Sequence, residues 1–359
     1  MLDFINTWLA TGGFWVAVPL IIVGCVALIK GADFLVDGAS GLAKKYGVSD
    51  IVIGLTVVAF GTSMPEFVVN MVAVGQGSTE IAITNVLGSN IINTFVILGC
   101  TALIFPISSQ KATRHFDIPF SLLAALLVLL FAVYNSPSWL QIEHIFNMNI
   151  ADPTLSDLGS IQMGQGNSGF ISGVGGSILL IFFLIFLWHN FKGIGSAPQT
   201  ESNEGYKPMS AKRALALILG GLVGLVVGGE LIVKSATSIA HSLGVSDAII
   251  GLTVVALGTS LPELATSCMA AFKKNCDIAL GNVIGSNIFN IFFILGTSAC
   301  VKALPGYHGL EIDALMAALG SVLVMLFVYL TKKHEIKRWH GAILLLTYAA
   351  YLTYRIITL

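Results

Sequence analysis

Two glutamates in a repeated motif are the side chains of this chain best placed to do chemistry. The motif reads Gly-Thr-Ser-x-Pro-Glu, and its two copies end at Glu66 and Glu263. Each copy follows a mostly apolar stretch, so both glutamates are expected near the middle of a membrane-spanning segment, where an uncompensated charge costs roughly 2.5–3.5 kcal/mol. No Lys or Arg lies near the middle of any apolar stretch. A bound cation is therefore the expected partner of both glutamates, and a structural salt bridge is the alternative.

The proline of each motif predicts a break in the helix next to the glutamate. Pro65 and Pro262 lack an amide hydrogen, and their rings crowd the carbonyl group four residues earlier. Backbone carbonyls freed in this way are tolerated in lipid only where they line a cavity or bind something. Helical spacing also places on the face of each glutamate the hydroxyl groups three and four residues before it, which belong to Thr62, Ser63, Thr259 and Ser260. Carboxylate, hydroxyl and carbonyl oxygens suit Ca²⁺ and Na⁺ better than transition metals.

A second repeated motif adds amide and hydroxyl groups. Its polar residues recur every four positions, which places them along one face of a helix. They are Asn85, Ser89 and Asn93 in the first copy, and Asn282, Ser286 and Asn290 in the second. Gly88 and Gly285 lie in the same motifs and permit a close approach of neighbouring helices. The serine and the second asparagine of each copy are predicted to bind the ion, whereas the first asparagine could equally form interhelical hydrogen bonds.

The composition indicates that a lipid bilayer surrounds the elements that carry these motifs. The chain has 359 residues, of which 55% are hydrophobic and 10% charged, and its mean hydropathy is +0.87. We therefore expect an all-α integral membrane protein with no sizeable soluble domain. At about 20 apolar residues per crossing, ten spans are predicted, at about 13–40, 49–74, 79–105, 115–134, 170–191, 211–242, 246–272, 277–302, 310–331 and 338–357. The net charge of −1 argues against a nucleic-acid partner, and the five cysteines show no metal-binding spacing.

The positive residues predict the orientation of these spans. Most Lys and Arg residues fall in alternate connections, which should be cytoplasmic, so both termini are expected outside. The polar segment 192–210 is interpreted as a cytoplasmic linker between two halves. The outer segment 135–176 contains no Lys or Arg, and it either collects cations or, as we favour, simply connects two helices.

The two halves of the chain are related by an internal repeat. Residues 49–99 match residues 246–296 at 28 of 51 positions with a constant offset of 197 and no gap. Each half, 1–191 and 211–359, is predicted to hold five helices, and an odd number inverts the second copy in the membrane. A duplicated but inert scaffold is the alternative, although packing alone would not keep the glutamate motif twice.

At these repeated motifs the chain resembles the sodium/calcium exchanger family of the cation/calcium exchanger superfamily, particularly its compact prokaryotic members. The resemblance covers nearly the whole chain. It implies that the second, third, seventh and eighth helices enclose the ions while the long first and sixth helices slide across them. The ligands implied by the resemblance are Ala59, Thr62, Ser63, Glu66, Ser89, Asn93, Ala256, Thr259, Ser260, Glu263, Ser286 and Asn290. Some relatives carry Asp where this chain has Asn290, which leaves two central carboxylates here, and the outer segment is longer than the compact members lead us to expect.

We therefore expect a secondary antiporter that exchanges Na⁺ for Ca²⁺ by alternating access in a prokaryotic plasma membrane. Ca²⁺ and Na⁺ would be transported substrates, with no permanently bound cofactor and no protein partner indicated. Exchange coupled to H⁺ or dependent on K⁺ is the nearest alternative, and an ion channel is a more distant one. An enzyme is not expected, because the histidines lie near ends or loops and no nucleophile–base arrangement is present. Asp33 and Glu230 match between the halves and could gate the path, although we favour anchoring at the membrane interface.

Overall fold

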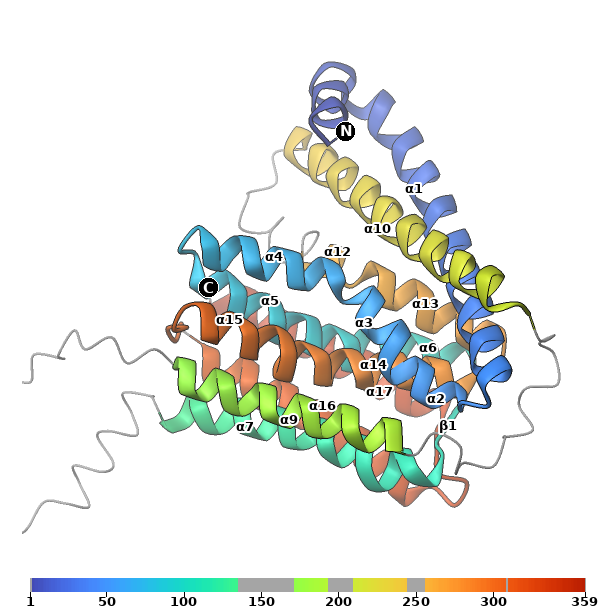
Figure 1. Cartoon of the computed structure of the whole chain (residues 1–359). Coiled ribbons are helices and arrows are strands. Elements are labelled where there is room, and N and C mark those ends of the chain that lie inside the picture. Colours follow the sequence, from blue (N-terminus) through green and yellow to red (C-terminus); the bar gives the residue numbers. More distant parts are fainter. Residues whose placement is uncertain (1, 135–170, 193–208, 244–255, 308, 359) are drawn as a thin grey trace, which may run out of the picture.

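The computed structural model describes five stretches of the chain (Figure 1), which are residues 2–134, 171–192, 209–243, 256–307 and 309–358. The predicted outer segment 135–176 and the linker 192–210 lie mostly outside these residues. So does the start of the predicted seventh span.

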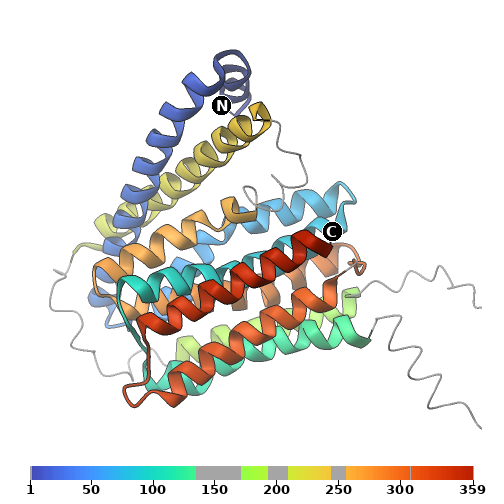
Figure 2. The same cartoon turned by 180° about the vertical axis from the view of Figure 1, so that it is seen from behind.

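Two long helices form a pair that leans away from the rest of the molecule. α1 spans Leu2–Tyr46 and α10 spans Ala211–Ser242. They run side by side in opposite directions in both views (Figures 1 and 2). α1 is longer than the predicted 13–40 at both ends, and large apolar side chains on it are exposed, as contact with lipid requires.

Glycines bring these two helices into close contact. Gly24 of α1 lies against the backbone of Gly228 in α10, and Gly31 lies against the backbone of Gly221. The contacts recur every seven residues along both helices, so one small-residue stripe faces the other and the backbones approach closely. We infer that α1 and α10 behave as one unit.

A methyl group added at Gly221 should destabilise this pair. A Cβ there would lie 2.7 Å from the carbonyl oxygen of Gly31 and 2.7 Å from the amide nitrogen of Leu35, which are backbone atoms. We expect Gly221→Ala to cost about 1–3 kcal/mol of stability, measured from the unfolding midpoint of the detergent-solubilised protein. Gly220→Ala is the matched control, because a Cβ at Gly220 meets nothing within 4 Å. Equal midpoints for the two variants would contradict this packing.

The remaining helices form the body of the protein. In the first half they are α2 (Asp50–Ile53), η1 (Gly54–Val58), α3 (Ala59–Thr62), α4 (Met64–Gly75), α5 (Thr79–Ile91), η2 (Ile92–Ile97), α6 (Leu98–Ile104), η3 (Thr113–Asp117), α7 (Ile118–Tyr134) and α9 (Gly173–Lys192). In the second half they are α12 (Ala256–Thr259), α13 (Leu261–Phe272), α14 (Cys276–Ile288), η7 (Phe289–Leu295), α15 (Gly296–Val301), α16 (Leu310–Leu330) and α17 (Arg338–Thr358).

The continuous helix α14–η7–α15 lies at the centre of this body, and nearly all residues of α14 and η7 are buried. α4 and α13 lie between it and the α1–α10 pair, while α7, α9 and α16 form the opposite side (Figure 1). One departure from an all-α fold is a short antiparallel pair of strands, β1 (Ile107–Ser108) and β2 (Glu335–Ile336), which joins two connections on one side of the helices.

The described residues contain seven helices long and apolar enough to cross a membrane, or eight when the bent segment of α2 to α4 counts as one span. These eight coincide with predicted spans. α17 covers the predicted 338–357 but is not among them, and the predicted 246–272 begins in residues that are not described. The count of ten spans therefore stays a prediction.

Candidate cation-binding site

Both glutamate motifs fold as broken helices. The segment before Ser63 and helix α4 meet at a bend of 45°, and α12 and α13 are separated at Ser260. The two serines have similar non-helical backbone angles, with φ −86° and ψ 7° at Ser63 and φ −91° and ψ 5° at Ser260. The breaks predicted from Pro65 and Pro262 are thus present. Each glutamate lies in the first turn of the following helix, where the positive end of the helix dipole favours a carboxylate.

The two glutamates lie near one another in the buried interior of the protein. Glu66 and Glu263 are each 1% exposed, and their carboxylates are close enough to repel one another. The ion pairs found among the described residues join Lys234, Lys273 and Arg355 to Glu230, Asp33, Asp37 and Asp313, and neither glutamate pairs with a described Lys or Arg. Two buried like charges without a countercharge are strongly unfavourable, and this geometry therefore calls for a cation.

Hydroxyl groups of one motif face the glutamate of the other motif. Ser63 Oγ donates a hydrogen bond of 2.8 Å to Oε1 of Glu263, not to Glu66 of its own motif. Conversely, the hydroxyls of Thr259 and Ser260 face Glu66. The prediction that each glutamate meets the hydroxyls of its own motif was wrong, because Ser63 sits at the helix break and does not follow the i, i+3 geometry of a continuous helix.

Several buried oxygens in these motifs have no hydrogen-bond partner. They are both carboxylate oxygens of Glu66, Oε2 of Glu263, Oγ1 of Thr259, Oγ of Ser260 and Ser286, and Oδ1 of Asn93 and Asn290. Buried polar atoms are rarely left unpaired in proteins, and each exception calls for an explanation such as a bound ion. Within the described part of the chain no cluster of three His, Cys, Asp or Glu residues is present. The donor set is thus two carboxylates with neutral oxygens, which suits Ca²⁺ and Na⁺.

Among the other predicted ligands, Ala59 and Thr62 already have hydrogen-bond partners. The carbonyl of Ala59 accepts the amide of Ser63 at 3.0 Å and lies 3.4 Å from the Thr62 hydroxyl. The Thr62 hydroxyl lies 3.1 Å from Oδ1 of Asn282. Ser89 is buried on α5, and Ala256 is the first described residue of α12.

The first asparagine of each second motif forms interhelical hydrogen bonds, which was one of the two predicted alternatives. Asn85 Nδ2 donates to the Glu66 carbonyl at 3.4 Å and to Oδ1 of Asn70 at 2.6 Å. Asn282 Nδ2 donates to the Glu263 carbonyl at 3.2 Å and to Oγ of Ser267 at 2.9 Å. These bonds tie the helix carrying each glutamate to the next helix.

Sequence reasoning missed Asn70 and Ser267. A signal was present, because both lie one turn after a glutamate and are separated by the offset of the repeat, 197. The two residues differ in type, however, so the repeated identity that marked the other site residues does not mark this pair.

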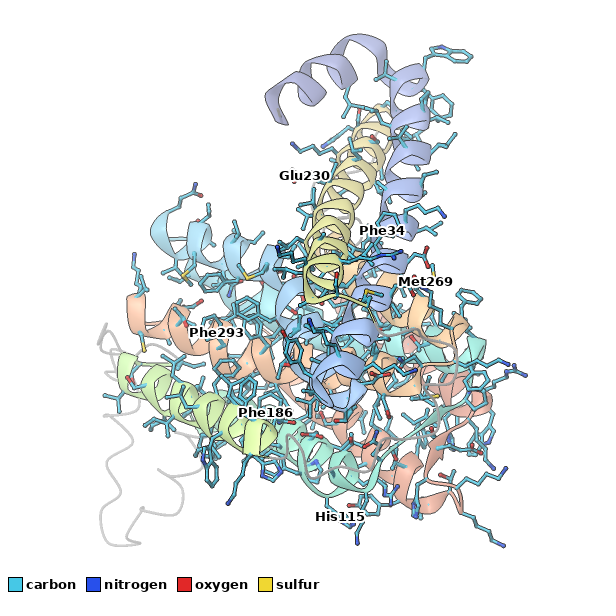
Figure 3. The ribbon with its side chains drawn as sticks, turned by 45° about the vertical axis from the view of Figure 1, so that its right-hand side comes forward. Phe34, His115, Phe186, Glu230, Met269 and Phe293 are labelled. Carbon is cyan, nitrogen blue, oxygen red and sulfur yellow. The ribbon has the colours of Figure 1, made fainter. Side chains whose placement is uncertain are left out.

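A groove of about 220 Å³ reaches the site from the side of α10. It is lined by residues of α4, α10, α12 and α13, among them Pro65, Thr259 and Pro262. Glu230, which also lines it, lies along the leaning part of the α1–α10 pair (Figure 3) and forms an ion pair of 3.2 Å with Lys234 on the same helix. The site is therefore next to a groove that α10 borders.

The chain is similar to known proteins over nearly its whole length. A family model for sodium/calcium exchanger proteins matches residues 16–192 and 213–357. The chain belongs to the sodium/calcium exchanger family. The putative antiporter CaxA of Alkalimonas amylolytica is 36% identical over 343 residues, which cover 94% of this chain and 97% of that relative. The sodium/calcium exchanger MaX1 of Methanosarcina acetivorans is 34% identical over 351 residues, which cover 93% of this chain and 96% of that relative.

Solved structures of the sodium-calcium exchanger NCX_Mj are also similar. One of them, soaked with 2.5 mM Na⁺ and 10 mM Sr²⁺, aligns with a TM-score of 0.75 at 31% identity and covers 95% of this chain and 99% of that chain. This member of the sodium/calcium exchanger family is thus a multi-pass membrane protein and a cation/Ca²⁺ exchanger, and not an enzyme.

Proposed function

We propose that this chain exchanges Na⁺ for Ca²⁺ across a prokaryotic plasma membrane by alternating access, with the twelve predicted residues as ion ligands. The observation that carries the proposal is the buried pair Glu66 and Glu263, which lie near one another among unpaired oxygens and have no basic partner among the described residues. A transported cation would supply the missing charge.

The charge of this pocket favours electrogenic exchange. One Ca²⁺ balances two carboxylates, whereas several Na⁺ in the same oxygen cluster carry at least one more charge than the carboxylates do. Because Asn290 stands where some relatives carry Asp, no third carboxylate compensates for it. Exchange of the two ion sets therefore moves net charge.

The inverted repeat of 1–191 and 211–359 supplies the two arrangements that alternating access requires. In this proposal the α1–α10 pair moves across the body. On the side of the α13–α14 connection, Lys273 Nζ lies 2.6 Å from Asp33 Oδ1 and 2.6 Å from Asp37 Oδ1 and ties α1 to the end of α13. On the other side, the groove beside α10 gives access. The ion pair supports a gating role for Asp33, the alternative that the sequence disfavoured, while the pairing of Glu230 within its own helix fits anchoring.

Flux in reconstituted vesicles tests the proposal. We expect an outward Na⁺ gradient to drive ⁴⁵Ca²⁺ uptake, and an inside-negative potential, set with K⁺ and valinomycin, to slow this uptake, because Na⁺ leaving in excess carries positive charge outward. Uptake that follows the Na⁺ gradient but is indifferent to voltage would contradict electrogenic exchange.

Matched vesicles separate the alternatives. Uptake driven by a pH gradient without Na⁺ would indicate proton coupling, and uptake that needs K⁺ at a clamped potential would indicate K⁺ dependence. A continuous current without any counter-ion would indicate a channel and would contradict exchange.

A further inference from the structure

We propose that Asn90 and Asn287 are positioning residues, which do not bind the ion but fix the direction in which the amides of Asn290 and Asn93 point. The proposal rests on the cation site proposed above. All four side chains are buried, with at most 4% exposed, and they connect α5–η2 of one half with α14–η7 of the other.

Two consecutive hydrogen bonds through Asn90 form the first relay. It begins at a backbone carbonyl oxygen, which can only accept a hydrogen bond. Asn90 Nδ2 donates to the backbone carbonyl of Asn287 at 3.1 Å. A carbonyl oxygen only accepts hydrogen bonds, so the amide of Asn90 has one possible orientation, with Oδ1 at its other end. That Oδ1 accepts Nδ2 of Asn290 at 3.0 Å. The nitrogen of Asn290 is therefore held by Asn90, and its Oδ1, which is buried and unpaired, is turned away from Asn90.

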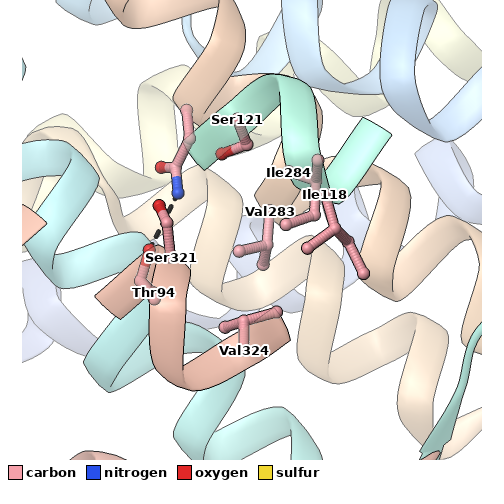
Figure 4. Close-up of a pocket in the computed structure, with 8 residues that line it drawn as sticks. Thr94, Ile118, Ser121, Val283, Ile284, Ser321 and Val324 are labelled. Atoms are coloured by element: carbon pink, nitrogen blue, oxygen red, sulfur yellow. Dashed lines mark hydrogen bonds between the residues drawn. The ribbon is translucent and has the colours of Figure 1, made fainter. Parts of the chain in front are cut away.

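The second relay mirrors the first. Asn93 Nδ2 donates to Oδ1 of Asn287 at 3.2 Å, and Asn287 Nδ2 donates to Oγ1 of Thr94 at 2.8 Å (Figure 4). Oδ1 of Asn93 is also buried and unpaired. Each relay crosses from one half to the other, as the contact of Ser63 with Glu263 does. Thr94 has Ile291 as its equivalent in the repeat, and because isoleucine has no hydroxyl, Asn90 donates to backbone instead.

The orientation matters because the two ends of an amide are chemically opposite. The oxygen can bind a cation, while the NH₂ group has only donors and repels it. Without its relay, Asn290 could turn its NH₂ group toward the ions. A carboxylate has two equivalent oxygens, so an aspartate at position 290 would present an oxygen in either orientation and would not need Asn90.

This difference gives a double-mutant test. We expect Asn90→Leu, which is similar in volume but cannot hold the Asn290 amide, to weaken ⁴⁵Ca²⁺ binding to the purified protein by about fivefold or more, the effect of one lost buried hydrogen bond. In a protein that carries Asn290→Asp, the same Asn90→Leu change should weaken binding by less than about twofold, because orientation no longer matters. A loss of packing alone would give the same penalty in both backgrounds.

The second relay, through Asn287 and Asn93, provides an independent test. Asn287→Leu should weaken binding in the wild-type background and have little effect beside Asn93→Asp, and this pair decides if Asn90→Leu does not yield a monodisperse protein. Equal penalties in both backgrounds, or no penalty in the wild type, would overturn the positioning role. Wild-type protein that shows no Na⁺-driven ⁴⁵Ca²⁺ uptake would instead overturn the proposed exchange, so the two failures are distinguishable.

Discussion

Glu263→Gln should abolish Na⁺-driven Ca²⁺ uptake, and Glu66→Gln should do the same. Each change keeps the shape of the side chain but removes one of the two charges in a pocket where both are 1% exposed. Loss of one charge from a buried, charge-matched set costs about 3–5 kcal/mol, so initial rates of ⁴⁵Ca²⁺ uptake at low Ca²⁺ should fall by about 100-fold or more. Ca²⁺ binding to the purified variants should fall in parallel.

Glu80→Gln is the matched control for both variants. Glu80 is exposed at the start of α5, the helix that carries the second motif. Its substitution therefore removes one negative charge from the same region without changing the buried site. We expect its uptake to stay within about twofold of wild type, as for most surface substitutions. Full uptake by either glutamate variant would remove the central support for a shared cation site.

Gly285→Ala should give the second large loss of transport, by about tenfold or more. A Cβ at this position would lie 2.6 Å from the carbonyl oxygen of Leu55 and 2.8 Å from Cβ of Ala59, so α14 would be pushed away from η1 and α3. Overpacking of this kind costs about 1–3 kcal/mol, and a shift at Ala59 also moves one face of the ion site. Initial uptake rates and unfolding midpoints should both be measured.

The control for this variant is again Gly220→Ala, which adds the same methyl group to a helix interior where nothing lies within 4 Å. It should leave uptake and stability unchanged or slightly improved. Wild-type uptake by Gly285→Ala would show that the close approach of α14 to α3 is not needed for the site. The predicted counterpart, Gly88, meets no described atom within 4 Å, and one of the partners that the repeat gives it, Leu252, lies among residues 244–255, which are not described.

The local features of the site were predictable because each has a local cause. Proline removes a helical hydrogen bond wherever it occurs, so the breaks next to Glu66 and Glu263 could be predicted from Pro65 and Pro262 alone. The membrane setting likewise follows from composition, since a chain with 10% charged residues cannot cover a water-soluble surface of this size. The close packing at Gly285 was also predicted.

The partners of individual polar groups could not be predicted in the same way. Sequence spacing assigned Ser63 to Glu66 by assuming a continuous helix, whereas the break turns Ser63 toward Glu263 of the other half. For Asn85 and Asn282 the pattern left two roles open, and only the positions of the neighbouring helices favoured hydrogen bonds over ion binding.

The sequence by itself determined which polar groups are available: two glutamates in repeated motifs, with hydroxyls and amides at helical spacing. Its apolar composition also determined that these groups lie in a membrane. Only the tertiary structure decided how they are shared, because Ser63 with Glu263 and Asn90 with Asn290 are contacts between residues 200 positions apart. Such contacts depend on how the helices of one half pack between those of the other. Helical periodicity describes neighbours within one helix and carries no information about that packing.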